Sequence, residues 1–160
     1  MKRIIFLFCL FCILFNVSHL QSAETPRRNE LLVLCYHDIS IDDIHDNYFT
    51  VSQKKFMQQL QFLQQHGYVF VSVQEVIASR AGQISLPDRA VLLTFDDAYR
   101  SFYTFVYPTL KRLGYPSMLA VVGKWAEQGA PPADLGSTAM MTWKEIAEVS
   151  RSGLVEIASH

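Results

Sequence analysis

Short apolar runs of strand length alternate with helix-like segments along most of the chain, and this alternation limits its fold more than any other feature. The apolar runs are LLVLCYH (31–37), YVFVSV (68–73), AVLLTF (90–95), SMLAVVG (117–123) and LVEIAS (154–159). The continuous run LLVLCYH is typical of a strand that is buried on both faces, and helices of this length between the runs are typical of crossovers between parallel strands. The pattern predicts an α/β fold with about five parallel strands in a sheet or barrel.

Capping residues mark where the intervening helices begin and end. Ser52 precedes apolar residues at helical spacing and Gly67 follows them, as expected at the two ends of a helix; the apolar residues are Phe56, Leu60 and Leu63. Two capping boxes predict further helix starts, one at Ser72 and Glu75 and one at Thr142 and Glu145. Pro108 interrupts the helical pattern of residues 99–115, so we expect a kink or two short helices there.

The N-terminal segment reads as an export signal. Lys2 and Arg3 precede an apolar run from Ile4 to Phe15, and the sequence turns polar before Ala23. Residues 1–23 are therefore predicted to be a signal peptide, and residues 24–30 a short polar linker. We expect an exported, periplasmic protein without a stable membrane span once the signal is cleaved. An uncleaved N-terminal anchor is the alternative.

Composition and charge narrow the class of protein. Half of the 160 residues are hydrophobic and 18% are charged, so the chain can bury a sizeable core and is expected to form a single domain. The formal net charge is −1 and the basic residues are scattered, which predicts no binding to nucleic acid. Cys35 is the one cysteine after the predicted signal, so no internal disulfide is expected.

Three of the predicted strands end in side chains that can bind a metal or move protons. His37 ends the first, Asp96 and Asp97 follow the third, and His160 follows the fifth. In parallel β/α folds the carboxyl ends of the strands share one edge, so these groups are expected to meet. Two carboxylates held close together raise one pKa unless a cation lies beside them, which points to a divalent metal.

Each of these residues also has a purely structural explanation. Adjacent aspartates at a strand end are often turn residues or helix caps, and a lone histidine such as His37 is often a core residue. What favours a site is that all of the groups fall at the same end of the predicted sheet.

Two other histidines are predicted to be structural or solvated, and two tryptophans to be buried. His45 lies in a polar loop, and His66 lies at a helix end, where a cation suits the dipole. Trp125 and Trp143 could stack on sugar rings, but buried packing is the expectation for both.

The phrases VLCYHDI, TFDDAY and VEIASH make the sequence similar to the polysaccharide deacetylases, the family with the NodB homology domain (carbohydrate esterase family 4). Together with GYVFVSV and GYPSMLAVVG, they resemble most the periplasmic branch that removes acetyl groups from poly-β-1,6-N-acetyl-D-glucosamine in biofilms. The resemblance implies a (β/α) barrel and hydrolysis of N-acetyl groups with release of acetate. It also implies an N-acetylglucosamine polymer as substrate and exopolysaccharide export machinery as a partner.

The resemblance assigns a role to each candidate residue. It implies that Asp96 is the catalytic base, that Asp97 and His160 bind the metal, and that His37 is the general acid. Donors of these types suit zinc, nickel, cobalt and iron alike.

Five predicted strands are fewer than a closed barrel needs. We therefore expect an incomplete (β/α) barrel, with residues 31–160 as the N-terminal, truncated part of a polysaccharide deacetylase domain. Two other functions stay open. One is a noncatalytic carbohydrate-binding remnant of such an enzyme, and the other is an aspartyl phosphatase. Phosphatases of that kind usually space their carboxylates Asp-x-Asp, which counts against the second.

Overall fold

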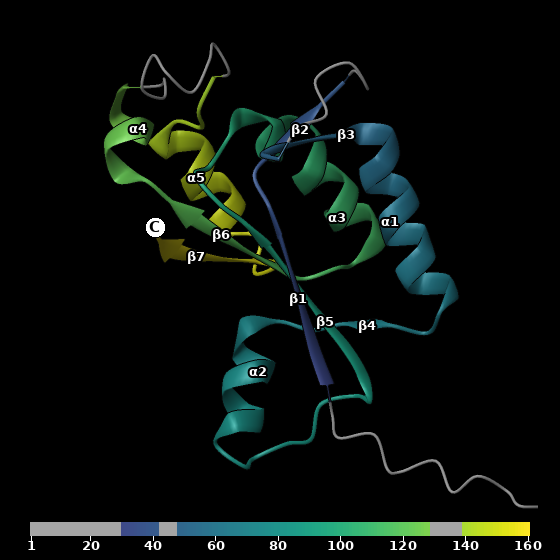
Figure 1. The fold of residues 1–160 in the computed structure, drawn as a ribbon. Coiled ribbons are helices and arrows are strands. Elements are labelled where there is room, and N and C mark those ends of the chain that lie inside the picture. The colour runs from purple at the N-terminus through teal and green to yellow at the C-terminus, as the bar shows by residue number, and fades with distance from the viewer. Residues whose placement is uncertain (1–29, 42–47, 129–138) are drawn as a thin grey trace, which may run out of the picture.

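The computed structural model describes residues 30–41, 48–128 and 139–160. Its centre is a five-stranded parallel sheet, which confirms the predicted α/β class and strand number (Figure 1). The strands are β1(Glu30–Tyr36), β4(Val69–Phe70), β5(Arg89–Phe95), β6(Ser117–Val121) and β7(Val155–Ser159). Their order is β1-β5-β6-β7, with β4 pairing the start of β5. Within the described residues the sheet does not close into a barrel.

Helices connect the strands, as expected for a parallel sheet. They are α1(Gln53–Gln65), α2(Val73–Arg80), π-helical η2(Phe102–Val106), α3(Tyr107–Leu113), α4(Gly123–Gln128) and α5(Trp143–Ser150). Both predicted capping boxes are present, and Ser52 accepts a hydrogen bond from the Lys55 N–H at the start of α1. Pro108 lies in the first turn of α3, directly after the π-helical segment, so the predicted interruption is a change of helix type.

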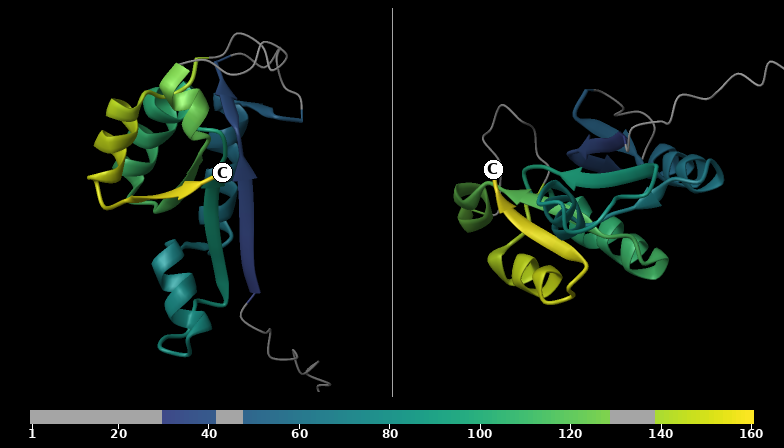
Figure 2. Two further views of the ribbon diagram at one scale, coloured as in Figure 1. Left: turned by 90° about the vertical axis from the view of Figure 1, so that its left-hand side faces the viewer. Right: turned by 90° about the horizontal axis from the view of Figure 1, so that it is seen from below.

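The main core lies between the sheet and the helices α1, η2, α3 and α5. Phe56 of α1, Phe95 of β5 and Phe102 of η2 are each at most 1% exposed, and the Phe95 ring contacts each of the other two edge to face. Helix α2 packs separately against Val71, Ala90 and Leu92, near the amino ends of the strands (Figures 1 and 2). The predicted site residues lie at the opposite end of the sheet, where they follow the carboxyl ends of the strands.

The segment after β1 contains a small second sheet that the sequence analysis did not predict. β2(Asp38–Ser40) pairs in parallel with β3(Thr50–Ser52), where a polar loop was expected. Each strand is three residues long, too short to produce a periodic pattern. The pair places Asp38 directly beside the end of β1.

Strand β1 differs from the prediction of a strand buried on both faces. Among the described residues only β5 pairs with it, so β1 is an edge strand. Leu32 is 36% exposed and Val33 is 51% exposed. The prediction was wrong because an apolar run shows that a strand can be buried but does not identify its neighbours.

Three smaller expectations also need correction. Strand β4 is only two residues long, because Ser72 already caps α2. Residues 123–128 form α4, a helix that the sequence analysis did not predict. Trp143 is 48% exposed rather than buried, since it begins α5 with its ring toward Gly123.

Several expectations fall outside the described residues. These are the signal peptide at 1–23, the linker up to residue 29 and the loop residue His45. Within the part of the chain that the structure describes, none of the helices has the length and apolarity needed to cross a bilayer.

Candidate active site

The four predicted site residues follow the carboxyl ends of three strands of one sheet. His37 follows β1, Asp96 and Asp97 follow β5, and His160 follows β7. Strand-like hydrogen bonds continue into these residues, because Asp96 N donates to Tyr36 O at 2.8 Å and His160 N donates to Val121 O at 3.0 Å. Backbone hydrogen bonds therefore fix the positions of the Asp96 and His160 Cα atoms.

The backbone turns directly after β5, so that the side chains of Asp96 and Asp97 can both point toward the same site. Asp97 has φ 71° and Ala98 has φ 60°, values that residues other than glycine rarely adopt. A regular strand would send the two side chains to opposite faces. The turn is held in place because Met141 N donates to Ala98 O at 2.8 Å.

His160 lies close to both carboxylates. Its Nε2 is 3.7 Å from Asp96 Oδ2 and 3.8 Å from Asp97 Oδ1. The Asp97 side chain is 12% exposed and that of Asp96 is 22% exposed, so the carboxylates have different access to water. The arrangement brings two carboxylate oxygens and one imidazole nitrogen, all possible metal ligands, together at the carboxyl end of the sheet.

Asp97 occupies an environment that disfavours an isolated negative charge. Burial raises the pKa of its carboxyl, His160 and His37 oppose that rise, and Asp96 adds to it. A carboxylate that loses water and faces a second carboxylate is stabilised by a nearby cation. Burial, with Asp97 and Asp38 close by, also raises the pKa of the Tyr99 hydroxyl.

His37 also lies close to Asp96. One donor atom each from Cys35, His37 and Asp96 lie within 4.8 Å of one another. The His37 ring also contacts Phe49 edge to face, with 5.3 Å between the ring centroids. The structure thus brings all four predicted residues to one end of the sheet.

The sequence analysis did not connect Asp38, Ser101 and Cys35 with the site. Ser101 Oγ donates to Asp38 Oδ1 at 2.7 Å and accepts from Ile39 N at 3.1 Å, which ties the segment after β1 to the start of η2. Nothing in the spacing of Asp38 and Ser101 indicates this contact.

Cys35 is a direct neighbour of Asp96. Its Sγ donates to Asp96 Oδ2 at 3.2 Å, and burial and then this hydrogen bond raise the pKa of the thiol. The signal for Cys35 was its position two residues before His37, which puts both side chains on one face of the strand.

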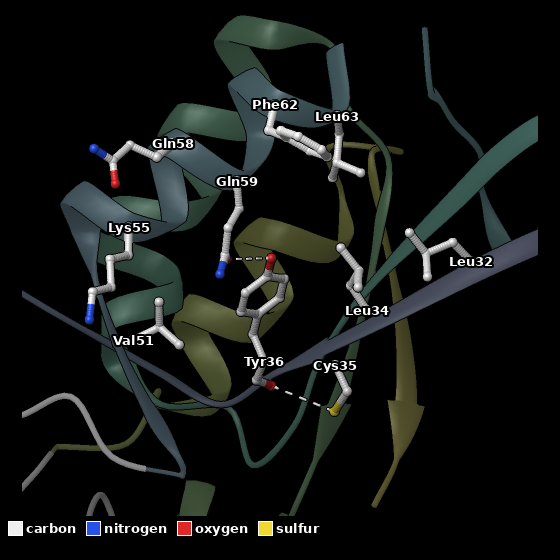
Figure 3. Close-up of a pocket in the computed structure, with 10 residues that line it drawn as sticks. All are labelled: Leu32, Leu34, Cys35, Tyr36, Val51, Lys55, Gln58, Gln59, Phe62 and Leu63. Atoms are coloured by element: carbon white, nitrogen blue, oxygen red, sulfur yellow. Dashed lines mark hydrogen bonds between the residues drawn. The ribbon is translucent and has the colours of Figure 1, made fainter. Parts of the chain in front are cut away.

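An open groove of about 690 Å³ runs between β1 and α1, and Cys35 is at one end of it (Figure 3). Tyr36 crosses this groove and donates a hydrogen bond from its hydroxyl to Gln59 Oε1 at 2.9 Å. The other lining residues are Leu32, Leu34, Val51, Lys55, Gln58, Phe62 and Leu63.

His66 lies away from this site. Its Nδ1 is 2.8 Å from Phe62 O at the end of α1, and its exposed ring stacks on Phe62. These contacts are in keeping with the expectation of a structural or solvated residue.

Comparison with known proteins relates the chain to a family. Residues 83–160, which contain Asp96, Asp97 and His160, match the family model described as polysaccharide deacetylase. The chain belongs to the polysaccharide deacetylase family. A curated family relative is the poly-β-1,6-N-acetyl-D-glucosamine N-deacetylase of Escherichia coli K12, which is 34% identical over 148 residues. That alignment spans 86% of this chain and 22% of the relative.

Solved structures of the family show the same fold. A de-N-acetylase from Aggregatibacter actinomycetemcomitans is 35% identical with a TM-score of 0.72, and the match covers 81% of this chain and 54% of that one. IcaB from Ammonifex degensii is 34% identical with a TM-score of 0.69, covering 84% and 54%. The chain thus spans about half the length of these two solved structures.

Proposed function

We propose that this polysaccharide deacetylase family member is a metal-dependent hydrolase that removes N-acetyl groups from an N-acetylglucosamine exopolysaccharide and releases acetate. The observation that carries the proposal is the meeting of His160 Nε2 with Asp96 Oδ2 and Asp97 Oδ1, at 3.7 and 3.8 Å, with a His37 ring nitrogen within 4.8 Å of Asp96. An amide is a poor electrophile, so its hydrolysis needs an activated water, a partner for the oxyanion and a proton donor.

The residues present suit a divalent metal. Asp97 offers a buried carboxylate beside a second carboxylate, and His160 offers an imidazole nitrogen 3.8 Å away. We propose that these two residues hold the ion. A bound zinc, nickel, cobalt or iron ion lowers the pKa of a bound water and polarises a carbonyl.

Asp96 and His37, the other two candidate site residues, are proposed to transfer protons. Asp96 is the more exposed carboxylate, and it accepts the proton of the attacking water. His37 donates a proton to the departing sugar amine as the C–N bond breaks. Their donor atoms lie within 4.8 Å of each other, close enough for an acid and a base to act on different atoms of one amide.

The substrate class comes from the relatives. The Escherichia coli and Staphylococcus aureus proteins that match this chain carry the name poly-β-1,6-N-acetyl-D-glucosamine N-deacetylase. We propose the same polymer as substrate here, with exopolysaccharide export machinery as a partner. The pattern of residues 1–23 supports a periplasmic location.

We also propose that residues 31–160 form the N-terminal part of a polysaccharide deacetylase domain. Alignment with about half of each solved relative supports the idea that these residues are one part of a larger domain. The edge position of β1 leaves room for further strands beside it.

The test is acetate release from N-acetylglucosamine oligomers by the purified chain supplied with zinc, nickel, cobalt or iron in turn. Asp96→Asn is the matched control, because it removes the proposed base and keeps the size of the side chain. Metal-dependent release by the wild type but not by the variant is expected. Oligomer binding without release, by this chain and by any natural longer form of it, would favour the noncatalytic carbohydrate-binding remnant.

A further inference from the structure

We propose that Cys35, His37 and Asp96 form a second cation site, which takes a thiophilic divalent ion such as Zn²⁺ or Cd²⁺ and inhibits deacetylation when it is filled. The binding claim stands on the geometry of these three residues alone. The inhibition claim rests on the proposed function, in which Asp96 is the base and His37 is the acid.

The three donors come from two neighbouring strand ends. Cys35 and His37 are two residues apart at the end of β1, so their side chains leave the backbone on the same side. Asp96 follows β5, and its N–H donates to Tyr36 O between the other two residues. One donor atom from each residue lies within 4.8 Å of the others, and Cys35 Sγ is 3.2 Å from Asp96 Oδ2.

These distances suit a tetrahedral ion after small side-chain rotations. Two donors bound to the same zinc ion at normal bond lengths are about 3.5 Å apart. Cys35 Sγ and Asp96 Oδ2 are 3.2 Å apart, close to that separation, and a His37 ring nitrogen within 4.8 Å of both needs to approach by about an ångström at most.

The donor set selects the kind of ion. Sulfur, imidazole nitrogen and a single carboxylate suit zinc and cadmium, whereas magnesium and calcium require mainly oxygen. The proposed catalytic pair, Asp97 and His160, contains no sulfur. A soft ion therefore prefers the Cys35 site, and a harder ion does not.

The two sites meet at Asp96. Its Oδ2 atom is 3.2 Å from Cys35 Sγ and 3.7 Å from His160 Nε2. An ion bound by Cys35, His37 and Asp96 takes the lone pairs that the base and the acid need for proton transfer. Occupancy is therefore incompatible with turnover.

The thiol is accessible to an ion from solution. Cys35 is exposed, lies at one end of the groove along β1 and is a free cysteine (Figure 3). Its proton is held in the hydrogen bond to Asp96, so the ion displaces that proton as the sulfur–metal bond forms.

The binding test is a Cd²⁺ titration of the purified chain, followed by the ultraviolet charge-transfer band of the cadmium–thiolate bond. Cys9 and Cys12 are replaced by serine in all samples, so that Cys35 is the only thiol. We expect His37→Gln and Asp96→Asn each to weaken Cd²⁺ binding by about 10-fold or more. His66→Gln, at an exposed histidine away from the site, is the control and should leave the affinity unchanged.

Unchanged Cd²⁺ affinity in both His37→Gln and Asp96→Asn would overturn the site, because the ion would then be held by a lone surface thiol. The inhibition test compares acetate release at rising Cd²⁺ for the wild type and for Cys35→Ser, each relative to its own cadmium-free rate. Cys35→Ser should need about 10-fold more Cd²⁺ for half inhibition. Equal sensitivity would overturn the inhibition claim. A chain that releases no acetate at all would refute the proposed function, and the spectral titration would still decide the site.

Discussion

His160 Nε2 lies 3.8 Å from Asp97 Oδ1 although the two residues follow different strands, β7 and β5, with β6 between them. The contact depends on the backbone after β5, where Asp97 and Ala98 both have positive φ. Because that turn changes the direction of the chain at Asp97, it links the local conformation of the backbone to the proposed chemistry.

The turn gives a prediction about Ala98, which is 1% exposed and has φ 60°. A branched side chain is strained at positive φ and has no space here, so Ala98→Val should lower the free energy of unfolding by about 2 kcal/mol or more. Ala98→Gly should keep the fold. Urea unfolding checks both.

Ala120→Val is the matched control for crowding, since Ala120 is 6% exposed but belongs to the regular strand β6. An equal loss of stability in Ala98→Val and Ala120→Val would mean that the backbone conformation at Ala98 has no special role.

Asp96→Asn should reduce acetate release by about 100-fold or more, because the amide cannot accept the proton of the attacking water. The measurement is the initial rate on N-acetylglucosamine oligomers at saturating metal. Asp88→Asn, at an exposed residue ahead of β5, is the control and should retain the wild-type rate. A rate for Asp96→Asn within a few-fold of wild type would remove Asp96 from the mechanism.

His37→Ala should slow the reaction most when the leaving group is poor. An amine must be protonated as it departs, whereas an activated phenolate leaves without help. We expect a loss of about 100-fold on N-acetyl substrates and a much smaller loss on an activated acetate ester. Equal losses on the two substrates would argue that His37 has a structural role instead. His66→Ala provides the control for loss of a histidine.

Tyr36 should make the fold sensitive to alkaline pH. Burial raises the pKa of its hydroxyl from 10.0 to about 12, so the folded state keeps the proton where the unfolded state loses it. The stabilising contribution is complete below pH 10 and is lost as the pH rises through about 12. Its size is on the order of 2 kcal/mol.

Tyr36→Phe tests this, because it removes the titrating group and keeps the ring that packs on Phe56 and Phe95. The variant should be less stable near neutral pH, since it loses the hydrogen bond to Gln59, but its stability should fall less between pH 10 and 12. A parallel fall in both proteins would assign the alkaline transition to other groups.

Much of the fold was predictable because the local signals agreed with the global architecture. Ser52, the two capping boxes and the five apolar runs mark elements that the structure contains. The edge position of β1 was not predictable, because strand order depends on pairing between distant segments. The pair β2 and β3 was missed because three-residue strands carry no period.

The site was predictable in position but not in detail. Parallel strands place their carboxyl ends together, so the meeting of His37, Asp96, Asp97 and His160 followed from the order of elements. Positive φ at Ala98 has no signal in a residue that is not glycine. The contact of Cys35 with Asp96 depends on the register of β1 against β5, which one sequence does not contain.

The most direct test of the proposed metal centre is zinc affinity by equilibrium dialysis in a Cys35→Ser background, which leaves out the second cation site. Asp97→Asn and His160→Gln should each weaken zinc binding by about 10-fold or more, while Asp96→Asn and His37→Gln change it only slightly. If Asp96→Asn weakens zinc binding more than Asp97→Asn does, or if no variant changes it, the proposed centre is contradicted.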